Sequence, residues 1–306
     1  MTPGERSNVV SQELLDLADV APGDQEKVAA AASRFRLECL TTAEGRFQQG
    51  YDLLDSYFGA RGELESRATL AGFVREGVLP YGNRMEGHYR MILAWDGSEL
   101  VGVRDCYADI DLDAGICVVA LSHSYVVPEC RRSGLAALFR AMPVTLARNV
   151  TRSVCETPPE ILLAAEMEPI DPADVGSVIR LVAYGRSGFS VADPSRLPYS
   201  QPDFRQPPQS LAIPLMPVVR WIDHERDTTL PILLAAAFPR LFHACHRQYL
   251  AAERVDPSEV HALRTLTRSP DPVPLLPLPR DPADAERIHP LLREHVLAHY
   301  PQRLRG

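Results

Sequence analysis

The stretch VVPECRRSGLAALF, residues 126–139, decides the fold. An apolar run stops at Pro128, two arginines and a glycine follow, and an apolar pattern with helical spacing begins at once. A strand that leads through a glycine-containing turn into a helix points several backbone N–H groups and the positive end of the helix dipole at one place. The stretch therefore predicts a phosphate-binding turn, and the alternative is a tight turn with solvated arginines.

The small residues of this stretch have an expected role of their own. Gly134 is expected to let the backbone approach the ligand without a side chain in the way, and Ala136 keeps the next position small. Arg131 and Arg132 add positive charge beside the turn.

Upstream of the turn, apolar stretches separated by turn residues predict three consecutive antiparallel strands, near 89–95, 99–110 and 116–127. Before them, GYDLLDSYFGA and ELESRATLAGFVREG predict a helical hairpin. SQELLDLADV and QEKVAAAASRFRLECL predict two further helices, which form an N-terminal helical arm over residues 1–45.

Downstream, a helix is expected from residue 134, which Pro143 could kink or shorten. A short buried strand at 161–169, a helix ending near YGRSGF and a strand at 211–221 follow. Residues 223–306 predict a helical C-terminal extension, interrupted by a proline-rich connector at 270–282.

Composition restricts the class of protein. The 306 residues are 45% apolar and 24% charged, which is typical of a folded globular chain. The net charge of −8 argues against a nucleic-acid partner and mildly favours a cationic one. No apolar run is long enough to cross a membrane, and the polar, acidic start is unlike a secretory signal, so a cytoplasmic location is expected.

The order of these elements and two motifs resemble the GNAT superfamily of acyl-CoA N-acyltransferases. Its central motif is glutamine or arginine, two residues, glycine, one residue, then glycine or alanine, and Arg131, Gly134 and Ala136 match it. The segment LVAYGRSGF resembles a second signature, a helix tyrosine before a glycine–phenylalanine turn. The resemblance implies an α+β fold with a mostly antiparallel central sheet flanked by helices, with the acetyltransferase domain at residues 46–222.

The resemblance further implies acetyl-CoA, or another acyl-CoA, as the donor. The diphosphate would sit on the turn, and the pantetheine arm would lie between strands 116–127 and 161–167. An amine of a small molecule or peptide would attack the thioester directly, with backbone N–H groups near residues 124–126 stabilising the oxyanion. The expected donor-binding residues are Ser124, Tyr125, Val126, Val127, Arg131, Arg132, Ser133, Gly134, Leu135 and Ala136.

The same resemblance implies that Tyr184 acts as the general acid that protonates the departing thiolate. The base is open between Glu166, on a buried strand, and His123, in the polar interruption SHSY. Tyr199 and Phe204, in the polar connector 195–210, are expected to contact the acceptor. A homodimer is also possible in such a protein.

Other clusters receive less specific interpretations. Asp105, Asp109, Asp111 and Asp113 could receive a cationic acceptor, although a solvated strand edge and turn explains them more simply. Histidine pairs in HACHRQ and HVLAH have helical spacing but no obvious third ligand, so no metal is expected. Two other functions stay open: a non-catalytic acyl-CoA-binding module, and an interaction scaffold built on the terminal helices.

Overall fold

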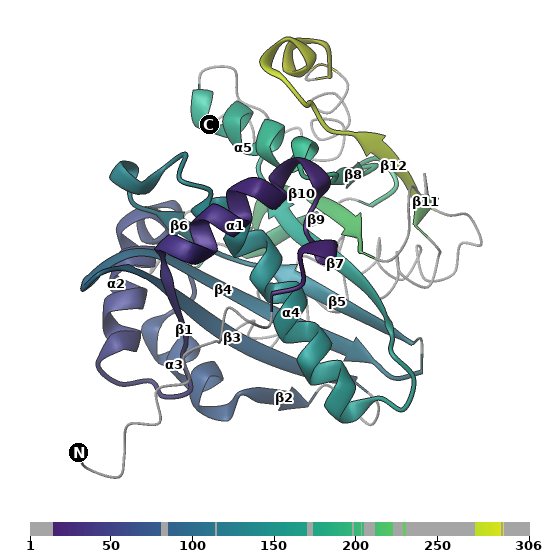
Figure 1. Ribbon diagram of the computed structural model, residues 1–306. Helices are drawn as coiled ribbons and strands as arrows, with labels where there is room; N and C mark the ends of the chain where they lie inside the picture. Colours follow the sequence, from purple (N-terminus) through teal and green to yellow (C-terminus); the bar gives the residue numbers. More distant parts are fainter. Residues whose placement is uncertain are drawn as a thin grey trace, which may run out of the picture. The chain divides into compact units, whose positions relative to one another are not determined.

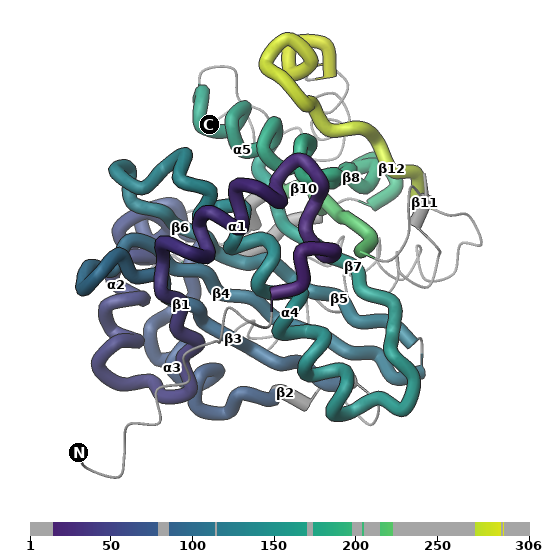
Figure 2. The backbone as a smooth tube through the Cα atoms, in the orientation of Figure 1, coloured from purple at the N-terminus to yellow at the C-terminus, as the bar shows by residue number. Residues whose placement is uncertain are grey.

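The computed structural model describes residues 15–80, 85–113, 115–169, 174–197, 199–202, 204, 212–222, 229–230, 273–288 and 290. The chain divides into two compact units, Met1–Pro159 and Glu160–Gly306. Figure 1 labels their elements and Figure 2 follows the same backbone as a tube.

The first unit is built on an antiparallel sheet with the strand order β1-β3-β4-β5. Strand β2 pairs with the far end of β3, and β6 pairs with β4 beyond the end of β5. The strands are β1 (Arg36–Cys39), β2 (Val78–Pro80), β3 (Met85–Asp96), β4 (Glu99–Asp111), β5 (Ile116–Leu121) and β6 (Ser124–Val126). The predicted three-strand meander is therefore confirmed, with its last strand broken into β5 and β6 around residues 122–123.

Helices cover both faces of this sheet. On one face, Gly102 of β4 leaves room for the Phe139 ring of α4, and α1 lies beside α4 (Figure 1). On the other face, Gly50 of α2 packs against Leu93 of β3, and α3 also packs on β3. The helices are α1 (Gln25–Arg34), α2 (Arg46–Phe58), α3 (Arg67–Glu76) and α4 (Leu135–Val154). The predicted helical hairpin is α2 and α3, and α4 continues through the buried Pro143.

The prediction of a wholly helical N-terminal arm over 1–45 is wrong in two places. Helix α1 ends at Arg34, and residues 36–39 form strand β1 on the edge of β3. Residues 17–19 form only a short 3₁₀ turn, and residues 1–14 lie outside the described part. Ion pairs hold this segment to α4: Arg148 donates two hydrogen bonds to the buried Asp19, and Arg140 pairs with Asp24.

Within the second unit the strands pair antiparallel in the order β7-β10-β8-β12-β11, with β9 on β10. Helix α5 (Val175–Arg186) precedes β8 and carries the LVAYGRSGF signature into the turn. The strands are β7 (Glu160–Met167), β8 (Ser190–Ala192), β9 (Tyr199–Pro202), β10 (Ala212–Trp221), β11 (Thr229–Leu230) and β12 (Val273–Pro277).

Strand β12 arises from the segment predicted to be a proline-rich connector, so that prediction is wrong for residues 273–277. The strand pairs with β8, and the Asp193 amide donates to the Pro274 carbonyl oxygen. The chain then passes over α5, where Arg186 Nε donates to the Arg280 carbonyl oxygen at 2.7 Å. Of the predicted C-terminal helices, residues 282–288 are helical, whereas 231–272 and 291–306 lie outside the described residues.

The α+β class with mostly antiparallel pairing is confirmed. None of the helices in the described part of the chain has the length and apolar character needed to cross a lipid bilayer.

Candidate functional site

The junction between β6 and α4 has the form that the sequence predicts. Strand β6 pairs with β4, a 3₁₀ turn follows at Pro128–Cys130, and α4 runs for 20 residues from Leu135. Hydrogen-bonded and non-bonded pairs alternate along an antiparallel ladder. Because the Val127 amide donates to Val101, Ser124 and Val126 fall at the positions whose N–H groups point away from β4. The strand therefore presents two amides at its other edge.

The turn itself concentrates further N–H groups. No side chain caps the start of α4, and the amides of Arg132, Ser133, Gly134 and Ala136 form no hydrogen bond with any described residue. Arg132 has φ of 66° and Gly134 has φ of 86°, both in the left-handed region. Turns of this kind gather successive N–H groups into an anion-binding concavity, and the dipole of a long helix adds to it.

Side chains of the turn stabilise its shape. Ser133 Oγ donates to the Cys130 carbonyl oxygen at 2.6 Å and lies 3.4 Å from the Leu135 amide. Arg131 Nε reaches back to the Val126 carbonyl oxygen at 3.5 Å. Arg131 and Arg132 are exposed, so both can change rotamer to meet an anion.

The reason for Gly134 differs from the one expected. A Cβ atom there would overlap the Lys27 carbonyl oxygen and lie 3.3 Å from Ala31 Cβ, both on α1. The side of Gly134 that a side chain would occupy is therefore filled by helix α1 and not by a ligand. Glycine is required at this position by its left-handed φ and by the close approach of α1.

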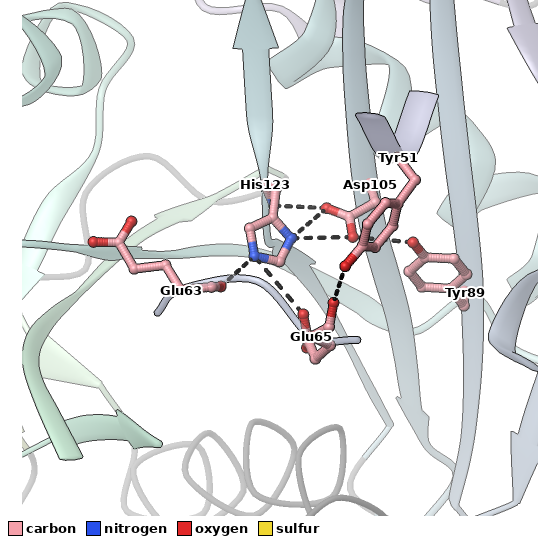
Figure 3. A network of polar contacts seen from close by, with 6 residues as sticks. All are labelled: Tyr51, Glu63, Glu65, Tyr89, Asp105 and His123. Atoms are coloured by element: carbon pink, nitrogen blue, oxygen red, sulfur yellow. Dashed lines mark hydrogen bonds and ion pairs between the residues drawn. The ribbon is translucent and has the colours of Figure 1, made fainter. Parts of the chain in front are cut away.

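His123, one of the two candidate bases, lies in a buried polar network (Figure 3). Its Nδ1 lies 3.1 Å and 3.2 Å from the two carboxylate oxygens of Asp105, and its Nε2 lies 2.7 Å from the Glu63 carbonyl oxygen. Burial alone would lower the pKa of His123, but the charge and hydrogen bond of Asp105 outweigh it and raise the pKa to about 10. At neutral pH this ring already holds its proton, which makes His123 unsuitable as a general base.

Asp105 and Asp109 are fully buried, so the interpretation of their stretch as a solvated edge is wrong for these two residues. Asp113, in the turn after β4, is exposed as expected. Burial would raise the pKa of Asp105, but the His123 charge and hydrogen bonds hold it below its ordinary value. No group of three metal-ligating side chains occurs among the residues that the structure describes. Both histidine pairs singled out in the sequence fall outside those residues.

In the second unit, Tyr184 lies in the last turns of α5 and is half-buried. Its ring meets the buried Phe189 ring edge to face at a centroid distance of 4.9 Å, and the Phe189 amide donates to the Tyr184 carbonyl oxygen. Gly188, with φ of 82°, makes the turn between them. The tyrosine and the glycine–phenylalanine turn thus form one local structure, which sets the direction of the phenol.

Glu166 lies on β7 opposite Pro217 of β10. It is half-buried, whereas its neighbours Ala165 and Met167 are buried, so its side chain is the more accessible one at this point of the strand. Tyr199 begins strand β9, inside the segment predicted to be a connector, and Phe204 is half-buried just beyond β9.

Sequence reasoning did not connect Asp105 with His123, and it gave no role to Glu65 or Arg104. Glu65 is buried in the loop between α2 and α3, with Oε2 at 3.8 Å from His123 Nε2. Arg104 is buried in β4, and its Nε and Nη2 have no hydrogen-bond partner among the residues that the structure describes. The sequence offered one signal for Arg104: a charged residue inside a predicted strand, where charged side chains are seldom buried.

Neither a protein-family model nor a curated protein matches this chain. Among solved structures it is similar to an aminoglycoside acetyltransferase from an uncultured soil metagenomic sample, solved in complex with sisomicin. The identity is 14%, the match covers 49% of this chain and 87% of that chain, and the TM-score is 0.32.

Two other solved structures resemble the chain to a similar degree. For an acyl-CoA N-acyltransferase from Pseudomonas aeruginosa the identity is 17%, the coverage 61% of this chain and 99% of that chain, and the TM-score 0.32. For a tandem GNAT protein from the clavulanic acid biosynthesis pathway the identity is 18%, the coverage 54% and 46%, and the TM-score 0.34.

Proposed function

We propose that this protein is an N-acyltransferase that moves an acetyl or other acyl group from acyl-CoA to a primary amine. The observation that carries the proposal is the turn after β6, where four amides that bond to no described residue, two left-handed residues and the start of a 20-residue helix meet beside two exposed arginines. A diphosphate matches this set of donors in charge and in the number of acceptor oxygens.

The roles of the strand follow from the direction of its amides. With the diphosphate on the turn, the thioester would lie along β6, whose Ser124 and Val126 amides point away from β4. When the amine nitrogen attacks, a C–N bond forms and the carbonyl oxygen gains negative charge. A fixed N–H donor at that oxygen contributes roughly 3 kcal/mol to the lowering of the barrier.

The reaction needs an acid and a base, and the candidates are Tyr184 and Glu166. As the C–S bond breaks, the thiolate takes the hydrogen of the Tyr184 phenol, and the attacking nitrogen loses its proton to the Glu166 carboxylate, directly or through a water. The half-buried position of Glu166 and the pKa of His123 near 10 favour Glu166 over His123. Loss of the acidic limb of the pH–rate profile is expected for Glu166→Gln; an unchanged limb would remove Glu166 from this role.

Release of the free thiol from acetyl-CoA, followed with a disulfide reagent in the presence of a panel of primary amines, tests the function. We expect thiol release that depends on the amine and saturates with it. Binding of acetyl-CoA by calorimetry without thiol release for any amine would favour the non-catalytic binding module instead, and no binding would refute both.

A further inference from the structure

The network around His123 fixes the point at which strand β6 begins. His123 is the residue before β6, and its backbone amide and carbonyl both form hydrogen bonds with one residue of β4, Asp105. The Asp105 amide donates to the His123 carbonyl oxygen at 3.1 Å, and the His123 amide donates to Asp105 Oδ1 at 2.6 Å. The Asp105 carboxylate thus accepts the hydrogen bond that a backbone carbonyl of β4 would accept in a regular ladder. This substitution occurs where the chain passes from β5 to β6.

The ring of His123 makes a second connection, to the loop between α2 and α3. The Glu63 carbonyl oxygen can only accept, so Nε2 carries a hydrogen, and the ionised Asp105 carboxylate can only accept, so Nδ1 carries one too. Both bonds exist together only when the ring is an imidazolium. A neutral ring has one N–H and therefore loses either the hydrogen bond to Glu63 of the loop or the one to Asp105 of β4.

The polar groups of the described residues that face this ring favour the imidazolium. Asp105 on β4 is held by the Tyr89 hydroxyl of β3 at 3.0 Å, and Glu65 lies on the loop side with Oε2 at 3.8 Å from Nε2. The Phe58 ring of α2 meets the imidazole edge to face at 5.1 Å. The Glu65 carbonyl oxygen is itself held by the Tyr51 hydroxyl at 2.9 Å, so the loop is fixed from a second side.

We propose that Asp105 is a positioning residue for the donor site: through the doubly bonded ring of His123 it holds the start of strand β6 and the α2–α3 loop in one arrangement. This inference rests on the proposed function, because β6 is where the thioester is expected to lie. Asp105 itself is fully buried and is not expected to touch the substrate.

The test compares Asp105→Asn with Tyr89→Phe. The asparagine keeps the size and an acceptor oxygen but removes the charge that supports the imidazolium, whereas Tyr89→Phe removes another hydrogen bond from the same carboxylate and leaves that charge. Affinity for acetyl-CoA is measured by calorimetry from pH 5.5 to pH 9, and the protonation of the His123 ring is followed by NMR, with His123→Gln identifying its signal.

We expect the wild-type ring to stay doubly protonated up to pH 9. At pH 7.5, Asp105→Asn should hold a neutral ring and bind acetyl-CoA about tenfold more weakly, the loss expected for one charge-assisted hydrogen bond. Its affinity should recover as pH falls through the point at which NMR shows the ring charged, and Tyr89→Phe should bind within about twofold of the wild type.

Three results separate the claims. Equal affinity of Asp105→Asn and the wild type at pH 7.5 overturns the positioning role and leaves the proposed function standing. Failure of the wild type to bind acetyl-CoA overturns both. Should Asp105→Asn not fold, the wild-type spectrum decides, since a ring that becomes neutral near its ordinary pKa cannot hold both partners and overturns the inference.

Discussion

Substitution of Gly134 by alanine tests whether the turn before α4 is shaped by packing. The new Cβ would overlap the Lys27 carbonyl oxygen, which is a backbone atom and can move only if α1 moves. An alanine in the left-handed region costs about 1–2 kcal/mol. Overpacking against a fixed neighbour adds about 1–3 kcal/mol. Gly134→Ala is therefore expected to lower the free energy of unfolding by about 2–5 kcal/mol in the absence of any ligand.

Urea denaturation of the two proteins measures this difference, and Gly72→Ala is the matched control. Gly72 lies inside α3, and a Cβ there meets nothing within 4 Å. The control should therefore stabilise the protein by about 0.5–1 kcal/mol, as alanine does in a helix. If Gly134→Ala unfolds within about 0.5 kcal/mol of the wild type and only loses acetyl-CoA affinity, the glycine serves the ligand and the packing explanation is refuted.

Three further predictions follow from buried or positioned groups. The pKa of His123 is raised from 6.5 to about 10 in the folded protein, so its stabilising contribution is complete below pH 6.5 and declines towards pH 10, by up to about 1.4 kcal/mol per pH unit. Denaturation between pH 7 and pH 9 should show this slope, His123→Gln should lack it, and a flat wild-type profile would contradict the charged pair. Arg104→Met should raise the free energy of unfolding by about 1–3 kcal/mol, because Nε and Nη2 are buried without a partner in the described part of the chain; a less stable variant would mean that the guanidinium is satisfied in the folded protein. Tyr184→Phe should lower kcat about 10²-fold or more and leave acetyl-CoA affinity unchanged, and unaltered turnover would remove the phenol from the acid role.

Local signals were enough to predict the frame of the first unit. The turn at Asp96-Gly97 closes the β3–β4 hairpin with Gly97 at φ of 61°, and the apolar spacing after Gly134 gives α4. Apolar spacing gave the wrong prediction, a helix, for residues 36–39. The segment RLEC suits a helix or a strand, and hydrogen bonds with the edge of β3 favour the strand. Strand β12 was not predicted, because Pro274 and Pro277 suit an edge strand and a loop equally. The pairing with β8, which the sequence does not show, makes this segment a strand.

Part of the candidate site could likewise be predicted from the sequence, and part could not. The residues of the turn form a contiguous stretch, so a motif could locate them. The network of His123 joins Asp105, Tyr89 and Glu65 from three other parts of the chain, and no spacing in a single sequence indicates that a charged residue within a strand will find a buried partner 18 positions away. For the same reason the sequence could not show that His123 is unsuitable as a base, because its raised pKa depends on Asp105, a neighbour that only the fold provides.

The central claim is that free amides at the start of α4 hold the diphosphate of acyl-CoA, and Ala136→Pro tests it most directly. Ala136 is exposed and its N–H bonds to none of the described residues, so proline in this first helical turn removes one donor without breaking a helical hydrogen bond. Calorimetry should show acetyl-CoA affinity reduced about tenfold with little change in thermal stability. Equal affinity of the variant and the wild type would contradict the claim.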